Sequence, residues 1–312
     1  MTSRRTSGLL YGLGAYGCWG VFPGFFPLLQ PAGALEVLAH RILWTVVLMA
    51  VIVIAVRRVG DLAKITGRVW LLLAVAAFLI SVNWLIYIYA VNNGHVVDAA
   101  LGYFITPLVS VAVGVLLFRE TLNKAQMAAL LIALVAVAVL AVQLGSVPWV
   151  ALGLAVSFGL YGAVKKLVPT DPRVSVGVEA GLAAPLALVY VVVIEVSGTG
   201  EFFSNGPGHS TLMVVTGLVT AIPLLCFAAA AQRLPLVTLG LLMYVNPVLQ
   251  MTWGLVVGQE PMPPARWVGF ALIWVALAVF SVDAVVRASS SATKNGSDVD
   301  AVPDRSSPQR HR

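Results

Sequence analysis

The chain has 312 residues, of which 60% are hydrophobic and only 10% carry a charge. Because a soluble domain is about half apolar and about a quarter charged, this composition excludes a soluble protein and indicates an integral membrane protein. The formal net charge is +6, but its distribution along the chain, given below, is explained by membrane topology, so we expect no nucleic-acid partner.

Ten apolar stretches are long enough to form transmembrane helices. A helix needs roughly 20 apolar residues to cross a bilayer, because lipid offers no partners to free backbone groups. The predicted spans are residues 8–28, 35–56, 69–90, 99–118, 125–144, 148–165, 175–196, 212–231, 236–257 and 267–286. The predicted fold class is therefore an all-α integral membrane protein with ten transmembrane helices.

The two halves of the sequence are related to each other. GLLYGLGAYG at 8–17 returns as GLAVSFGLYG at 153–162. Matching positions near the end of each half are Gly102, Pro107, Gly114 and Glu120 in the first and Gly240, Pro247, Gly254 and Glu260 in the second. Five spans per half would make the second half enter the membrane from the opposite side, which is typical of the inverted repeats of transporters.

Positively charged residues fall on one side of the predicted membrane. Lys and Arg are kept on the cytoplasmic side during insertion. With the N-terminus inside, the inner segments hold Arg4, Arg5, Arg57, Arg58, Lys64, Arg68, Arg119, Lys124, Lys165, Lys166, Arg173, Arg233, Arg287, Lys294, Arg305, Arg310 and Arg312. The outer loops hold only Arg266, and Arg41 lies within a span. We therefore expect both termini in the cytoplasm and a multi-pass protein of the plasma (inner) membrane, with the lipid bilayer as a partner.

The predicted organisation has three parts. Residues 1–145 form the first five-helix repeat and residues 146–287 form the second. Residues 288–312 are rich in Ser, Asp, Asn, Pro and Arg and have almost no large apolar side chains. Such a segment cannot offset the entropy of ordering, so we predict a disordered cytoplasmic tail.

The second span contains the polar residues Glu36, His40 and Arg41. A charged side chain deep in the bilayer usually faces a cavity or a partner, which makes Arg41 a candidate for lining or gating a solute site. The alternative is a structural counter-ion, with Glu179 in the seventh span as its partner. His40 is either a hydrogen-bonding residue or, if transport is coupled to protons, a titratable group together with Glu36 and Glu179.

The third span places Asn83 and Tyr87 on one helical face, with Trp84 beside them. A polar and aromatic stripe suits a site for a solute that is partly apolar and partly hydrogen-bonding. Hydrogen bonding between helices is the alternative for Asn83.

The outer turn that follows the third span carries Asn92, Asn93, His95 and Asp98. We interpret most of these residues as solvated or capping groups. Asp98, directly before the predicted start of the fourth span at Ala99, is expected to be its N-cap.

Pro107 and Pro247 occupy matching places in the fourth and ninth spans. A proline removes a backbone donor, and interrupted helices at equivalent positions of two inverted halves indicate a central binding site. The polar and aromatic residues near these prolines are Tyr103, Tyr244, Asn246 and Gln250. We therefore include all four among the candidate solute-binding residues.

The first span presents a surface of small residues. Its glycines are Gly8, Gly12, Gly14, Gly17, Gly20 and Gly24. Such a surface permits close helix contact, either between two copies in a homodimer or within one bundle. The similar string at 153–162 favours packing within the bundle.

Several other classes of protein lack their required sequence features. There is no Gly-Lys dipeptide, and hence no phosphate-binding loop of an ATP-driven pump. The motifs H-E-x-x-H, G-x-S-x-G and C-x-x-C are also absent, so we expect no enzyme activity, metal site or cofactor. A structural or signalling membrane protein without solute flux is the remaining alternative.

Five longer strings carry a resemblance to a known family. They are AHRILW at 39–44, NWLIYIYAVNN at 83–93, LGYFITPL at 101–108, IPLLCFAAAAQRL at 222–234 and FALIWVALAVFSVDA at 270–284. They resemble the RarD group of EamA proteins in the drug/metabolite transporter superfamily. The resemblance implies an inner-membrane carrier of two inverted five-helix repeats. It also implies a central cavity lined by the spans that hold Arg41, Asn83, Trp84, Tyr103 and Asn246.

The function predicted from the sequence is a secondary transporter of a small metabolite or drug-like solute. We expect it to work by alternating access and to export its solute.

Overall fold

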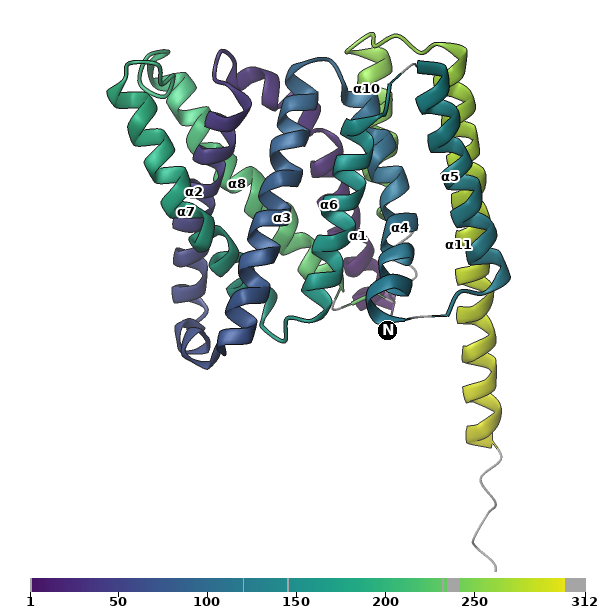
Figure 1. The fold of residues 1–312 in the computed structure, drawn as a ribbon. Helices are drawn as coiled ribbons and strands as arrows, with labels where there is room; N and C mark the ends of the chain where they lie inside the picture. Colours follow the sequence, from purple (N-terminus) through teal and green to yellow (C-terminus); the bar gives the residue numbers. More distant parts are fainter. Residues whose placement is uncertain (1, 120, 145, 232, 235–241, 301–312) are drawn as a thin grey trace, which may run out of the picture.

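A computed structural model describes residues 2–119, 121–144, 146–231, 233–234 and 242–300, and all regular structure in these ranges is helical (Figure 1). The long helices are α1 Thr2–Gly20, α2 Ala34–Ala55, α3 Gly67–Asn92, α4 Val96–Phe118, α5 Lys124–Leu144, α6 Trp149–Lys166, α7 Pro172–Val196, α8 Gly206–Ala231, α10 Val245–Val256 and α11 Pro264–Asp300. Short 3-10 helices are η1 Phe22–Gly24, η2 Phe26–Leu29 and η3 Val59–Lys64.

Seven of the described helices are long and apolar enough to cross a membrane, and the shorter α6 is apolar as well. The predicted all-α fold is therefore confirmed for the described residues, and the length and composition of these helices suit a membrane protein, while the count of ten spans stays a prediction. The first predicted span ends as an α-helix at Gly20, because Pro23 and Pro27 start two 3-10 helices in its place.

The ninth predicted span is interrupted. Met243 and Tyr244 form a turn and α10 begins at Val245, while the preceding residues 235–241, with Leu239 and Gly240, lie outside the described residues. Pro247 therefore sits in the first turn of α10, where a missing N–H costs little. Pro107 lies inside α4, so the two prolines do not occupy the same place in their helices.

Helices of the two halves interlock throughout the bundle. Helix α1 contacts α8 and α10, and α6 contacts α3 and α4. The remaining pairings across the halves include α2 with α7, α4 with α10 and α5 with α11. In Figure 1, α5 and α11 stand together at one edge of the bundle and α2 and α7 at the other.

Glycines permit several of these contacts. A Cβ on Gly102 would lie 2.7 Å from the carbonyl oxygen of Ala151, so a side chain would separate α4 from α6. Similar close contacts to residues of the second half are made by Gly8, Gly12, Gly20 and Gly24. Those four glycines of the first predicted span therefore pack within the chain.

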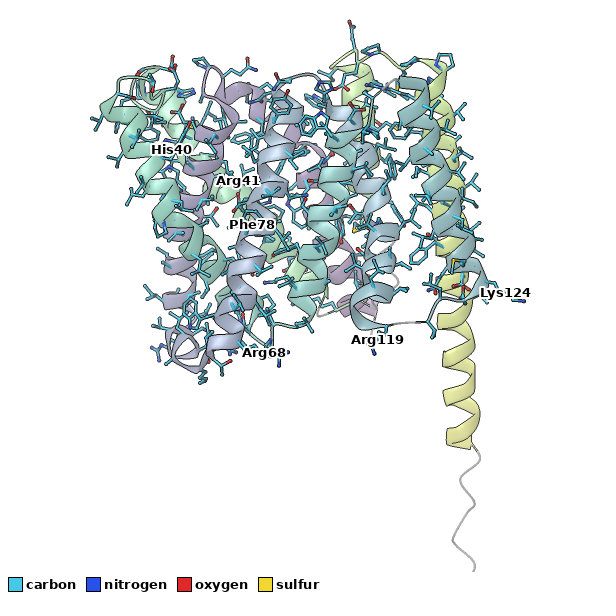
Figure 2. The ribbon with its side chains drawn as sticks, in the orientation of Figure 1. His40, Arg41, Arg68, Phe78, Arg119 and Lys124 are labelled. Carbon is cyan, nitrogen blue, oxygen red and sulfur yellow. The ribbon has the colours of Figure 1, made fainter. Side chains whose placement is uncertain are left out.

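One end of the bundle, called the basic end here, carries Arg68, Arg119 and Lys124 (Figure 2). At the opposite end, the carboxylate of Glu260 accepts the backbone N–H groups of Val96 and Val97 at 2.5 and 2.9 Å. Helix α4 can therefore begin at Val96, and the prediction of Asp98 as its N-cap is wrong. Glu120, the residue of the first half that matches Glu260, lies outside the described residues.

Helix α11 continues past Arg287 to Asp300 and extends beyond the other helices in Figure 1. The sequence predicted disorder from residue 288 onward. Ala, Ser and Lys residues that tolerate a helix occupy part of this segment. Residues 301–312 lie outside the described residues.

Candidate solute-binding cavity

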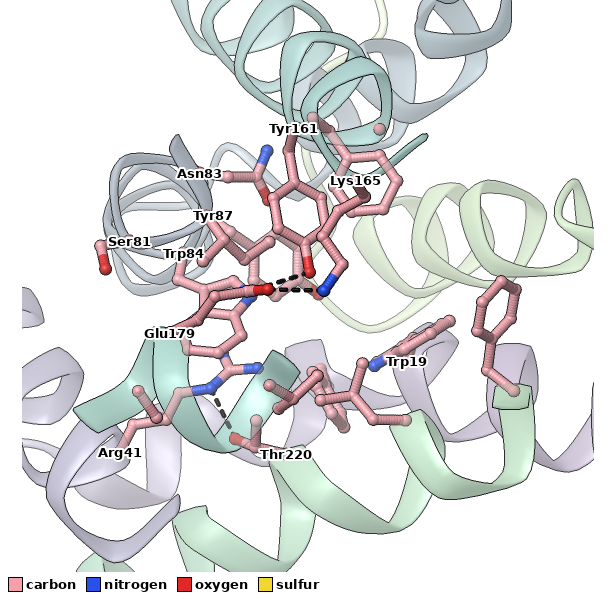
Figure 3. A pocket seen from close by; sticks show the side chains of 18 of the residues that line it. Trp19, Arg41, Ser81, Asn83, Trp84, Tyr87, Tyr161, Lys165, Glu179 and Thr220 are labelled. Carbon is pink, nitrogen blue, oxygen red and sulfur yellow. Dashed lines mark hydrogen bonds and ion pairs between the residues drawn. The ribbon is translucent and has the colours of Figure 1, made fainter. Parts of the chain in front are cut away.

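A cavity of about 550 Å³ lies between the two halves of the chain. Its wall is formed by α1 to α4 of the first half and by α6, α7, α8 and α10 of the second (Figure 3). It extends from Arg41, in the interior of α2, to Lys165 and Arg173, where α6 and α7 end and begin at the basic end. The volume is in the range of sites for small organic ligands.

Arg41 is the central charged residue of this wall and is only 3% exposed. Its Nε donates to Thr220 Oγ1 at 2.7 Å, and its Cζ lies 4.1 Å from the centroid of the Trp84 ring. Phe22 and Phe26 also lie within cation–π distance, at 5.7 and 5.5 Å. Its Nη1 has no hydrogen-bond partner. The aromatic rings partly replace water around the guanidinium group and leave one end of it available for a ligand.

Asn83 combines the two roles considered for it from the sequence. Its Nδ2 donates to the Leu154 carbonyl at 3.1 Å and to Ser157 Oγ at 2.9 Å, which links α3 to α6. Its Oδ1 accepts from Tyr103 Oη at 3.3 Å. Asn83 and Tyr103 also line the cavity. Tyr87, one turn along α3, lines the cavity as well and its buried hydroxyl has no partner.

The polar contribution of α10 comes from Asn246 and Gln250. Gln250 Nε2 donates to Asn246 Oδ1 at 2.8 Å, and both residues line the cavity. Gln250 is 1% exposed and its Oε1 has no partner. This amide oxygen therefore adds an acceptor to the cavity wall.

Glu179 does not form the ion pair with Arg41 that was the alternative to a role in the cavity wall. Its partners are Lys165 Nζ at 2.5 Å and Tyr161 Oη at 3.1 Å (Figure 3). Ser175 Oγ also donates to it, at 2.8 Å. Lys165 also donates to Ser175. Neither Lys165 nor Tyr161 was predicted as a site residue, since Lys165 at the end of a predicted span is also explained by membrane topology. Their four-residue spacing on α6 was the available signal.

Five of the candidate residues do not line the cavity: Glu36, His40, Tyr244, Pro107 and Pro247. The His40 ring stacks on Phe202, with centroids 4.6 Å apart. Glu36 Oε1 accepts the backbone N–H of Glu201 at 2.8 Å. Successive residues of a helix point about 100° apart, which is why His40 faces away while Arg41 faces the cavity. Tyr244 packs against the apolar cluster that contains Phe104 and Phe270.

A second ion pair lies at the mouth of the cavity. Asp171 caps α7 by accepting the N–H of Arg173 at 2.9 Å, and its other oxygen pairs with Arg173 Nη2 at 2.9 Å. The hydrogen bond from the Arg173 side chain lowers the pKa of Asp171 to about 2. Because Arg173 and Lys165 each have a carboxylate partner, Arg41 is the unpaired cation among the described lining residues.

Fold and site define a helical membrane protein with a central cavity lined in part by aromatic side chains and by a buried arginine. A family model for EamA-like transporters matches residues 6–142. The chain is 47% identical to "Protein RarD" of Streptomyces exfoliatus, over 94% of this chain and 93% of the relative. It is 38% identical to "Protein RarD" of Escherichia coli (91% and 97% covered) and 40% identical to "Uncharacterized transporter YojE" of Bacillus subtilis (93% and 99% covered).

The chain therefore belongs to the EamA-like transporter family, within its RarD group. It is a multi-pass inner-membrane protein. A solved structure titled "Crystal structure of protein" is similar with a TM-score of 0.59 at 19% identity, covering 88% of this chain and 97% of that one. At this identity the likeness concerns the fold alone.

Proposed function

We propose that this protein is a secondary transporter that exports a small amphipathic solute through the cavity by alternating access. The observation that carries the proposal is a set of buried polar atoms of cavity-lining residues that have no partner: Arg41 Nη1, Tyr87 Oη and Gln250 Oε1. An unsatisfied buried polar group costs about 1–3 kcal/mol. A solute that bonds to these atoms would recover this cost.

The wall chemistry favours a solute with an apolar, flat part and one acceptor or anionic group. Trp84, Tyr103 and Phe158 supply aromatic surface, and Arg41 supplies a positive charge without a carboxylate partner. A planar guanidinium group binds carboxylates and similar acceptors with paired hydrogen bonds. The relative "Chloramphenicol-sensitive protein RarD" of Pseudomonas aeruginosa, 28% identical, has a name that mentions a drug of mixed polarity, which supports including antibiotics among the solutes tested.

The two halves, 1–145 and 146–287, are proposed to be inverted repeats. The helix pairings support this, because the contact of α1 with α8 has its equivalent in the contact of α6 with α3. Likewise, α2–α7, α4–α10 and α5–α11 each join equivalent helices of the two halves. We take the basic end as cytoplasmic, which is supported by the N-terminus, Arg68, Arg119 and Lys124 lying at the same end (Figures 1 and 2).

The experiment is a thermal-shift screen of the purified protein against metabolites and antibiotics, followed by efflux from proteoliposomes for each hit. A ligand that binds only the folded state raises the melting temperature. Substitution of Arg41 by Ala should abolish the shift and the flux of an acidic hit, whereas Arg58→Ala, at an exposed position, should change neither. A full shift and flux in Arg41→Ala would contradict the proposed site.

A further inference from the structure

A second cluster of charged and metal-ligating groups lies outside the cavity. Glu36 and His40 of α2 face Glu195 of α7, and one ligand atom from each lies within 4.8 Å of the others. Glu36 and His40 are each 4% exposed and Glu195 is half-buried. The sequence gives no motif for this cluster, since Glu195 is far from the other two residues along the chain.

The His40 ring is unsatisfied where it stands. Neither Nδ1 nor Nε2 has a hydrogen-bond partner, and Glu195 Oε1 is also buried without one. Phe202 covers one face of the ring in a nearly parallel stack, with an angle of 8° between the planes. The stack fixes the ring plane and leaves both nitrogens free along its edge. A buried histidine without partners calls for a ligand or ion to satisfy it.

We propose that Glu36, His40 and Glu195 bind a divalent transition-metal ion, with Zn²⁺ as the best fit. Imidazole nitrogen and carboxylate oxygen are Zn²⁺ ligands, and each lies about 2.0–2.2 Å from the ion. Two such ligands lie at most about 4.4 Å apart across the ion. The three ligand atoms lie within 4.8 Å of one another, so small side-chain rotations would bring all three to the ion. Among the described residues, neither carboxylate forms an ion pair or a hydrogen bond with His40.

Neighbouring backbone already holds two of the three ligands in place. Glu36 Oε1 accepts the N–H of Glu201, which leaves the second oxygen for the ion. The Glu195 carboxylate packs against Gly200, where a Cβ would lie 2.5 Å from Oε1. An ion bound here would join α2 to α7, one helix from each half, away from the cavity mouth.

The test is a Zn²⁺ titration of the chelator-treated, purified protein, followed by competition with a chromogenic chelator. We expect one saturable ion per chain and a rise in melting temperature on loading. Because loss of even an outer-shell partner weakens metal binding by about 10–100-fold, His40→Gln and Glu195→Gln should each weaken it by at least ~10-fold. His95→Gln, at a partly exposed histidine outside the cluster, should bind like the parent.

Each outcome is decisive without reference to transport. Absence of saturable Zn²⁺ binding to the parent protein would overturn the proposal, and so would equal binding by the parent and His40→Gln. Glu195→Gln changes a half-buried position and covers the case in which His40→Gln does not fold. Gly200→Ala, which keeps all three ligands but displaces Glu195, should show intermediate affinity.

Discussion

The two ends of the bundle differ in how they are filled. At the end opposite the basic one, Phe26, Leu29, Ile88 and Met213 belong to a continuous buried apolar cluster that draws on both halves. At the basic end, the space between the halves is the cavity, bordered by the Lys165–Glu179 and Asp171–Arg173 ion pairs. The related halves therefore close one end and leave the other hollow.

Transport by alternating access requires a state of this kind, in which one end is open and the other is packed. A carrier with a central site exposes it to one face while packed side chains close the other. Arg41 lies where the two regions meet, since it lines the cavity and its Cζ lies 5.5 Å from the centroid of the Phe26 ring in the closed end. The comparison predicts that substitutions at the two ends act by different physical means.

The largest expected effect is at the basic end. Lys165→Met would leave Glu179, whose side chain is 5% exposed, without its cation. Removing one partner of a buried pair costs about 3–5 kcal/mol, and the lower figure applies because the Lys165 side chain is 24% exposed. The double variant Lys165→Met with Glu179→Gln should recover most of the loss in thermal unfolding. If Lys165→Met alone were as stable as the double variant, the Lys165–Glu179 pair would be solvated and the prediction would be wrong.

At the closed end, the expected effect is steric. A Cβ on Gly24 would lie 2.6 Å from the Trp253 ring, so Gly24→Ala should overpack the contact between η1 and α10. Overpacking costs about 1–3 kcal/mol, and we expect a lower melting temperature. The matched control is Gly14→Ala, which has no atom within 4 Å and should stabilise α1 by about 0.5–1 kcal/mol. Equal effects of the two substitutions would contradict tight closure.

A smaller, pH-dependent effect is expected at Glu260. Burial raises the pKa of this carboxyl above its ordinary value, against the opposing effect of the Val97 and Val96 N–H groups. A raised pKa in the folded state gives a stabilising contribution that is complete below the ordinary value of about 4.3 and is lost as the pH rises through the raised pKa. The melting temperature of the parent relative to Glu260→Gln should therefore fall as the pH rises from about 4. If the melting temperature of the parent relative to Glu260→Gln rose with pH, the result would contradict this prediction.

Much of the fold could be predicted from the sequence, because lipid imposes a minimum apolar length on each helix. The predicted span 35–56 corresponds to α2 Ala34–Ala55, and 125–144 to α5 Lys124–Leu144. One error occurs where a distant part of the chain acts on a helix end. Glu260 starts α4 at Val96 from more than 160 positions away, and no local pattern contains that information.

The site was harder to predict than the helices. Arg41, Asn83 and Tyr87 line the cavity as expected, since polar groups in lipid need an interior face. His40 is adjacent to Arg41 but points elsewhere, and which helical faces converge depends on packing that periodicity in a membrane does not reveal. Glu179 was considered as a counter-ion of Arg41 or as a coupling group, but its partner is Lys165, whose position at the end of a span had already been explained by topology.

The measurement that tests the central claim most directly is the accessibility of the cavity from each face of the membrane. Ser81, which lines the cavity, would be replaced by Cys in a background with Cys18 and Cys226 changed to Ser, and Val91→Cys in the closed cluster would be the control. A membrane-impermeant maleimide should label Ser81→Cys faster from the cytoplasmic face and should leave Val91→Cys unlabelled. Faster labelling of Ser81→Cys from the outer face would contradict the account.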